Sequence, residues 1–197
     1  MDLALERFWV IDVEGNGASP PEIVEIALVG VFNLELQSKR MEWLVRPQVP
    51  ISPAVTRIHG ITDIDVADAP DIDDIADDVM TWTNGARIIG HNVRVELDAI
   101  SRSIPEWQPA MAIDTLKLAK SVCPGLQSYG LERLGQYFEL TDQASRLSGK
   151  KYHSALYDSV LTALLFIELV MALPEVRRSA ALIDCDLLNP SQGSLLL

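Results

Sequence analysis

The order of hydrophobic and polar residues predicts that the chain opens with β-strands. Residues 8–17 form an apolar stretch that is interrupted by Asp12 and Glu14 and ends in a glycine-rich turn. Two further stretches, 23–31 and 41–45, continue the β pattern. We therefore expect a meander of three strands at the start of the fold.

A helical period follows between residues 71 and 82. Apolar residues recur there at i, i+3, i+4, i+7 and i+8, and aspartates occupy the other positions. This pattern predicts an amphipathic helix whose acidic face is solvated. The preceding segment contains three prolines, and we interpret 58–62 as a loop in which Thr62 or Asp63 caps a helix.

Strands and helices alternate in the rest of the chain. Short apolar strands are predicted at 87–90 and 111–113, and a helical pattern follows each of them. The predicted helices extend through about residue 102, over 115–122 with Asp114 as cap, over 131–138, and over about 154–173 up to Pro174. Strands first and alternation afterwards predict an α/β protein with a mixed sheet flanked by helices.

The composition fits one globular domain with a core. The chain has 197 residues, of which 48% are hydrophobic and 22% are charged. It has no apolar run of about 18 residues and no basic and apolar leader, so we expect a cytoplasmic protein. Cys123 and Cys185 lie far apart without metal-ligand spacing, so we expect reduced thiols.

The net charge of −12 argues against broad, nonspecific adhesion to duplex nucleic acid, which needs clustered lysines and arginines. It does not exclude a nucleic-acid enzyme, because bound metal ions supply local positive charge in a deep site.

Two carboxylates on the first strand are the first candidate for chemistry. Asp12 and Glu14 stand two residues apart, so their side chains point to the same face of the strand. On a central strand they would be costly to bury without a cation or a proton, which favours Mg²⁺ or Mn²⁺ held through oxygen. The alternative is an edge strand on which both carboxylates face water.

The start of the long apolar helix carries a second group. His153 precedes this helix, and Asp158 lies in its first turns. Alone, the two residues fit an N-terminal cap and dipole pair. Together with Asp12 and Glu14 they suggest two metal ions held by three or four carboxylates, and an imidazole that takes a proton from water to cleave a phosphodiester.

Three ordered motifs resemble those of the DEDDh family of 3′→5′ exonucleases, which includes ribonuclease T and exonuclease X. The motifs are residues 11–14, 90–96 and 153–158, and the resemblance covers about residues 8 to 170. It implies an α/β, ribonuclease H-like exonuclease fold with a five-stranded mixed sheet flanked by helices.

The resemblance also implies residue roles. Asp12 would bridge two metal ions, Mg²⁺ or Mn²⁺, Glu14 and Asp158 would complete the site, and His153 would be the general base. The residues expected near the terminal nucleotide are Gly15, Asn16, Gly17, Ile58, His59 and Asn92.

The second motif departs from the family pattern. The family usually has Phe-Asp where this chain has Val95-Glu96. We choose Glu96 as the fourth acid because it keeps the motif register. Asp98 is the alternative, but on a helix it would point about 200° away from Glu96. The longer side chain of Glu96 would suit Mn²⁺ better than Mg²⁺, which demands near-ideal octahedral geometry.

We expect an exonuclease domain at 1–174 and a C-terminal extension at 175–197. The end, 192–197, is similar to peptides that bind the bacterial sliding clamp, and the alternative is a disordered or packed tail. The expected reaction releases nucleoside 5′-monophosphates from the 3′ end of single-stranded nucleic acid, with DNA favoured over RNA. The rival hypotheses are a catalytically weakened nucleotide-binding or polymerase/clamp adaptor module, and an exoribonuclease or oligoribonuclease.

Overall fold

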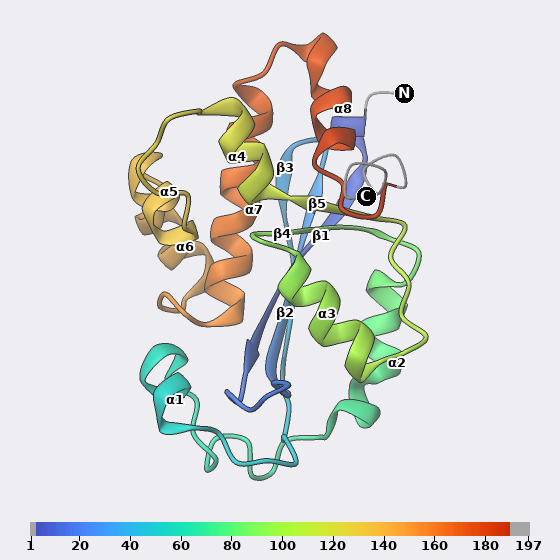
Figure 1. Ribbon diagram of the computed structural model, residues 1–197, viewed down its shortest axis with the longest axis vertical. Helices are drawn as coiled ribbons and strands as arrows, with labels where there is room; N and C mark the ends of the chain where they lie inside the picture. Colours follow the sequence, from blue (N-terminus) through green and yellow to red (C-terminus); the bar gives the residue numbers. More distant parts are fainter. Residues whose placement is uncertain (1–2, 190–197) are drawn as a thin grey trace.

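A five-stranded mixed sheet forms the centre of the fold in a computed structural model that describes residues 3–189 (Figure 1). The strands, in the spatial order β3-β2-β1-β4-β5, are β3 (Glu35–Leu44), β2 (Ile23–Phe32), β1 (Arg7–Gly15), β4 (Arg87–Gly90) and β5 (Met111–Asp114). The first three pair antiparallel, and β1, β4 and β5 run parallel. The predicted meander and mixed sheet are confirmed, and β1 is a central strand.

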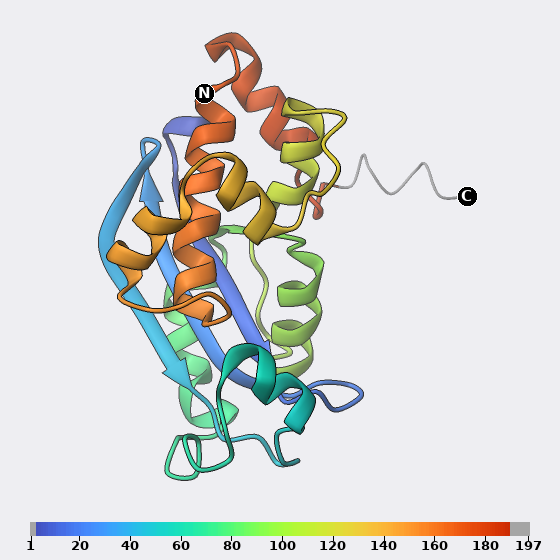
Figure 2. The same ribbon diagram turned by 90° about the vertical axis from the view of Figure 1, so that its left-hand side faces the viewer.

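Helices cover both faces of this sheet (Figure 2). The helical elements are η1 (Leu3–Leu5), α1 (Pro53–His59), α2 (Ile72–Thr83), α3 (Arg94–Ser103), α4 (Thr115–Val122), α5 (Leu131–Tyr137), α6 (Thr141–Ser148), α7 (Ala155–Met171) and α8 (Glu175–Asp184). One face packs on α7, with α4, α5 and α6 beside it, and the other face packs on α2 and α3 (Figures 1 and 2).

Alternation along β1 divides the core into these two layers. Phe8 and Val10 pack in the cluster around α7, and Trp9 and Ile11 pack in the cluster with α2 and α3. Asp12 and Glu14 continue the α7 side of the strand. The binary pattern of β1 therefore aims both carboxylates at the start of α7.

Most predicted helices are present with their caps. Asp71 begins α2 with a capping box, because its side chain accepts from the Asp74 N–H and the Asp74 side chain accepts from the Asp71 N–H. Asp114 caps α4 by accepting from the Leu116 N–H at 2.9 Å. Helix α7 is buried along nearly its whole length, as a helix with apolar residues on all sides must be.

The prediction of a loop over 58–62 is wrong for its first two residues. Ile58 and His59 form the last turn of α1, which begins at Pro53 and ends where Gly60 turns into the left-handed region with φ 82°. Proline is compatible with the first position of a helix, where its missing N–H costs nothing, so it did not break this segment. Neither Thr62 nor Asp63 caps a helix; the carboxylate of Asp63 accepts from the Ile51 N–H at 2.8 Å instead.

Besides α1, two further helices, α6 and α8, had no predicted counterpart. Helix α8 packs near η1, and Asp186 beyond it accepts from the Ala112 N–H on β5 at 2.9 Å. The proposed boundary after residue 174 stays a prediction, and residues 192–197 lie outside the described part of the chain. Within residues 3–189, no helix has the length and apolar character needed to cross a membrane.

Candidate active site

Four carboxylates from three elements meet where β1 leaves the sheet. Asp12 and Glu14 come from β1, Asp158 comes from the first turn of α7, and Glu96 comes from the first turn of α3. Strand β4 pairs with β1 only at Trp9 and Val10, and α3 packs against β1 and β2. The short parallel pairing therefore leaves the end of β1 open to Glu96.

His153 reaches the same place from the segment before α7. One ligand atom each of Glu14, His153 and Asp158 lie within 4.8 Å of one another. The His153 backbone has φ 65°, and its imidazole packs against the Tyr152 ring at a centroid distance of 3.8 Å. The structure thus brings together residues that stand about 140 positions apart in the sequence.

Burial, together with neighbouring acidic charges, raises the pKa values of the four carboxylates. Burial raises the pKa of Asp12 well above its ordinary value, and the charges of Asp158, Glu96 and Glu14 add to this effect. Burial is also the main cause that raises the pKa of Glu14 and of Glu96 to about 8. The pKa of Asp158 is raised to about 7, although the His153 backbone N–H donates to it and lowers it.

No protein cation offsets this charge among residues 3–189. Neither the Arg87–Glu6 nor the Lys150–Glu42 ion pair includes one of the four carboxylates. Buried carboxylates are costly unless they are paired, protonated or bound to a metal ion. The site is therefore built for a cation or for protons.

Two buried oxygens show that the donor set fits a divalent metal. Glu96 Oε2 and Asp158 Oδ1 have no hydrogen-bond partner among the described residues. An unpartnered buried acceptor is costly in a folded protein, and such oxygens in a cluster are the ligands that Mg²⁺ and Mn²⁺ prefer.

The structure separates the two alternatives for the fourth acid. Glu96 is buried, and its charge acts on Asp12. Asp98 is exposed and lines a cavity of about 270 Å³ between α3 and the end of β1, together with Arg102 and Glu14. Burial and the coupling to Asp12 therefore favour Glu96 over Asp98 as the fourth acid.

The turn after β1 uses Asn16 as an internal brace. Asn16 is fully buried; its amide donates to the Val49 carbonyl at 3.0 Å and accepts from the N–H groups of Ala18 and Glu22 at 3.0 and 2.9 Å. Its side chain thus holds the loop together. Gly17 has φ 77°, and a Cβ there would lie 2.6 Å from Ser52 Oγ, so the close packing on α1 requires glycine.

The other predicted substrate-binding residues lie around the cluster. His59 Nε2 lies 3.3 Å from the Gly15 carbonyl oxygen, and Ile58 beside it is about half exposed. Asn92 is exposed with φ 64°, and its N–H donates to Asp114 Oδ1 at 2.9 Å. His59 is thus held at the end of β1, and Asn92 at the end of β5.

Glu25 is a fifth carboxylate that sequence reasoning missed. It lies opposite Glu14 across β1 and β2, is buried, and accepts from the Ala155 N–H at 2.7 Å. Burial raises its pKa to about 7. A lone acid within the apolar stretch 23–31 was the available signal, but its position opposite Glu14 depends on strand register.

Comparisons with known proteins show which family the chain resembles in sequence and in fold. The exonuclease family of RNase T matches residues 9–166. DNA polymerase III subunit epsilon of Rickettsia conorii is 30% identical over 175 residues, which cover 83% of this chain and 74% of that protein. A PolC-type DNA polymerase III of Caldanaerobacter subterraneus subsp. tengcongensis is 29% identical over 175 residues, 86% of this chain but only 12% of that much longer protein. A solved structure of exonuclease X in complex with 5′ overhanging duplex DNA matches with a TM-score of 0.71 and 32% identity, over 88% of this chain and 98% of that chain.

Proposed function

Since this chain belongs to the RNase T/DEDD family of 3′→5′ exonucleases and has its ribonuclease H-like fold, we propose that it releases nucleoside 5′-monophosphates from the 3′ end of single-stranded DNA. The observation that carries this proposal is the meeting of four carboxylates and an imidazole where β1 ends and α7 begins.

The proposed ligands for two divalent metal ions are Asp12, Glu14, Glu96 and Asp158. When bound, Mg²⁺ or Mn²⁺ would supply the positive charge that attracts a phosphodiester and eases both attack by water and departure of the leaving oxygen. The carboxylates must lose their protons to hold these ions.

We assign the general base to His153. Burial lowers the pKa of its imidazole below the ordinary value of 6.5, so the ring is neutral at pH 7 and has a nitrogen free to accept a proton. Its place beside Glu14 and Asp158 puts that nitrogen at the edge of the carboxylate cluster, where water and a phosphate would meet.

The preference for a free strand end follows from charge and shape. A chain with a net charge of −12 repels the phosphates of a long duplex, so the favourable contact is confined to one terminal nucleotide in the site. The named relatives are a DNA polymerase III subunit and a PolC-type DNA polymerase III, and exonuclease X was solved with DNA, which supports DNA over RNA.

A time course with 3′-labelled and 5′-labelled single strands of DNA and RNA tests the reaction. We expect stepwise shortening from the 3′ end in Mg²⁺ or Mn²⁺, faster on DNA, with none in EDTA and none by Asp12→Ala. Shortening from the 5′ end, or activity that survives EDTA, would contradict the proposal. Faster hydrolysis of RNA would point to the exoribonuclease alternative, and metal binding without turnover to the weakened binding module.

The partner proposal concerns the end of the chain. We propose that 192–197 binds a sliding clamp, because a glutamine, a small polar residue and large apolar residues occur there in that order. Deleting these residues should weaken clamp binding in surface plasmon resonance and leave the hydrolysis of short oligonucleotides unchanged. Equal clamp binding by both forms would remove this role.

A further inference from the structure

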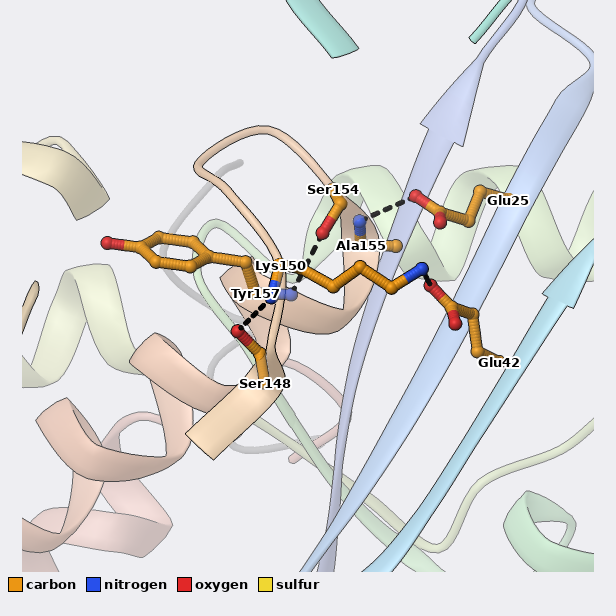
Figure 3. A network of polar contacts seen from close by, with 7 residues as sticks. All are labelled: Glu25, Glu42, Ser148, Lys150, Ser154, Ala155 and Tyr157. Carbon is orange, nitrogen blue, oxygen red and sulfur yellow. Dashed lines mark hydrogen bonds and ion pairs between the residues drawn. The ribbon is translucent and has the colours of Figure 1, made fainter. Parts of the chain in front are cut away.

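The segment 149–155 carries His153 between α6 and α7 and needs external support. Gly149 and His153 both have positive φ, 68° and 65°, so the segment turns sharply twice within a few residues. Its own bonds are local: Ser148 Oγ accepts from the Lys150 N–H at 3.1 Å, and Ser154 Oγ caps α7 by accepting from the Tyr157 N–H at 3.2 Å (Figure 3). These bonds shape the segment but do not attach it to β1.

Two carboxylates of the sheet hold the segment from outside (Figure 3). Glu25 on β2 accepts from the Ala155 N–H at 2.7 Å, and Glu42 Oε1 on β3 lies 2.7 Å from Lys150 Nζ. These two contacts, the ties of the segment, lie at its two ends, and His153 lies between them. The two glutamates also share a hydrogen bond, so the ties form one network.

Strand register connects this network to the carboxylate cluster. Glu25 is the direct partner of Glu14 in the pairing of β1 with β2, and Glu42 pairs with Ala27, the next residue on that face of β2. Cross-strand partners on one face lie close together. Glu25, which accepts from the first N–H of α7, therefore lies beside Glu14 of the candidate site. A shift of the Ala155 tie would therefore move His153 relative to Glu14.

The contacts and the burial of Glu25 fit a structural role at the start of α7. Ala155 is the first residue of α7, so its N–H has no acceptor within the helix, and the positive end of the helix dipole favours a carboxylate there. Glu25 is only 3% exposed, and its carboxylate already accepts from the Ala155 N–H at 2.7 Å.

We propose that Glu25 is a positioning residue: by binding the Ala155 N–H, with the Lys150–Glu42 ion pair as a second tie, it places His153 beside Glu14 and Asp158. The kinetic part of this inference rests on the proposed function, in which His153 is the base.

The test compares Glu25→Leu, which removes the acceptor, with Glu25→Gln, which keeps one. For Glu25→Leu we expect faster amide hydrogen exchange at 150–157 and a kcat lower by about 10²-fold, because misplacing a catalytic group by about 1 Å has that cost. For Glu25→Gln we expect a kcat within about threefold of the wild type, since a neutral acceptor replaces a charged one. Glu35→Leu, at an exposed position of β3, is the matched control and should change neither quantity.

A charge swap keeps the inference testable if Glu25→Leu does not fold. Glu42→Lys and Lys150→Glu should each speed exchange at 150–157, and the double variant should restore the wild-type rate. Unchanged exchange in the folded variants would overturn the proposal, as would a Glu25→Gln variant as inactive as Glu25→Leu, which would indicate a metal ligand. Exchange is measured without substrate, so an inactive wild type would refute the proposed function and leave this test intact.

Discussion

At the scale of single residues, the site gathers carboxylates that have no positively charged side chain as an ion-pair partner among the described residues. Burial and mutual repulsion raise the pKa values of Asp12, Glu14, Glu96 and Asp158, and no ion pair among the described residues involves them. Such clustering of raised pKa values is typical of functional sites, because a core would avoid it. Each side chain can therefore be tested for a distinct role.

His153 should be essential for the rate and dispensable for the fold. The imidazole is half-buried at the edge of the cluster, so His153→Ala leaves little empty space. We expect kcat to fall by about 10²–10⁴-fold if it is the general base, with thermal unfolding close to that of the wild type. A loss of less than about threefold in steady-state kinetics would remove it from this role.

Glu96 and Asp98 form a matched pair for the fourth acid. They lie on one helix two residues apart, and only Glu96 is buried against Asp12. We expect Glu96→Ala to weaken Mn²⁺ binding in calorimetry and to lower kcat by at least about tenfold more than Asp98→Ala does. The opposite order would show that Asp98 supplies the ligand.

At the scale of elements, the site depends on how the ends of β1, α1, α3 and α7 are held. Asn16 braces the turn after β1, Asp114 holds the turn before α3, and Ser154 caps α7. Each of these polar groups satisfies backbone N–H or C=O groups that a chain end would otherwise leave unpaired. The reactive side chains therefore come from element ends with defined geometry.

The packing of the β1 turn on α1 can be tested with two glycines. Gly17 and Gly60 both have positive φ, but a Cβ at Gly17 would lie 2.6 Å from Ser52 Oγ, whereas a Cβ at Gly60 would have no neighbour within 4 Å. Gly60→Ala should cost about 1 kcal/mol of stability for its backbone alone. Gly17→Ala should cost more in denaturant unfolding, and equal losses would show that the contact with Ser52 relaxes freely.

At the scale of the whole molecule, the buried acids link stability to pH and to metal ions. The pKa of Glu14 and of Glu96 is about 8 in the folded protein against an ordinary value of 4.5. The unfolded chain therefore loses these protons at lower pH than the folded chain does. Their contribution to stability is complete below pH 4.5 and is lost as the pH rises through 8.

Metal-free protein should accordingly unfold at a lower temperature at about pH 8.5 than at about pH 6, and Glu14→Gln should reduce that difference. Adding Mn²⁺ should raise the unfolding temperature most at the higher pH, because the ion binds the deprotonated carboxylates. Differential scanning calorimetry with EDTA or Mn²⁺ measures both effects. A Glu14→Gln variant with the wild-type pH dependence would contradict this linkage.

The sequence by itself determined the class of the fold and singled out the motif residues from which the site is proposed. Period-two and helical patterns identified all five strands and most helices, because these periods follow from the geometry of each element. Alternation on β1 put Asp12 and Glu14 on one face, and helical geometry separated Glu96 from Asp98. Helix α1 was missed because proline at a helix start resembles proline in a loop.

Only the tertiary structure decided which residues meet. The contact of Glu25 with Ala155 spans 130 positions, and it exists because strand register places Glu25 opposite Glu14 while α7 packs across the same face. The burial of the Asn16 side chain likewise depends on Val49, which a local pattern does not connect to it. Periodicity is a property of neighbouring residues, whereas register, burial and charge coupling arise when distant elements pack together, so the motif residues were visible in the sequence and their supports were not.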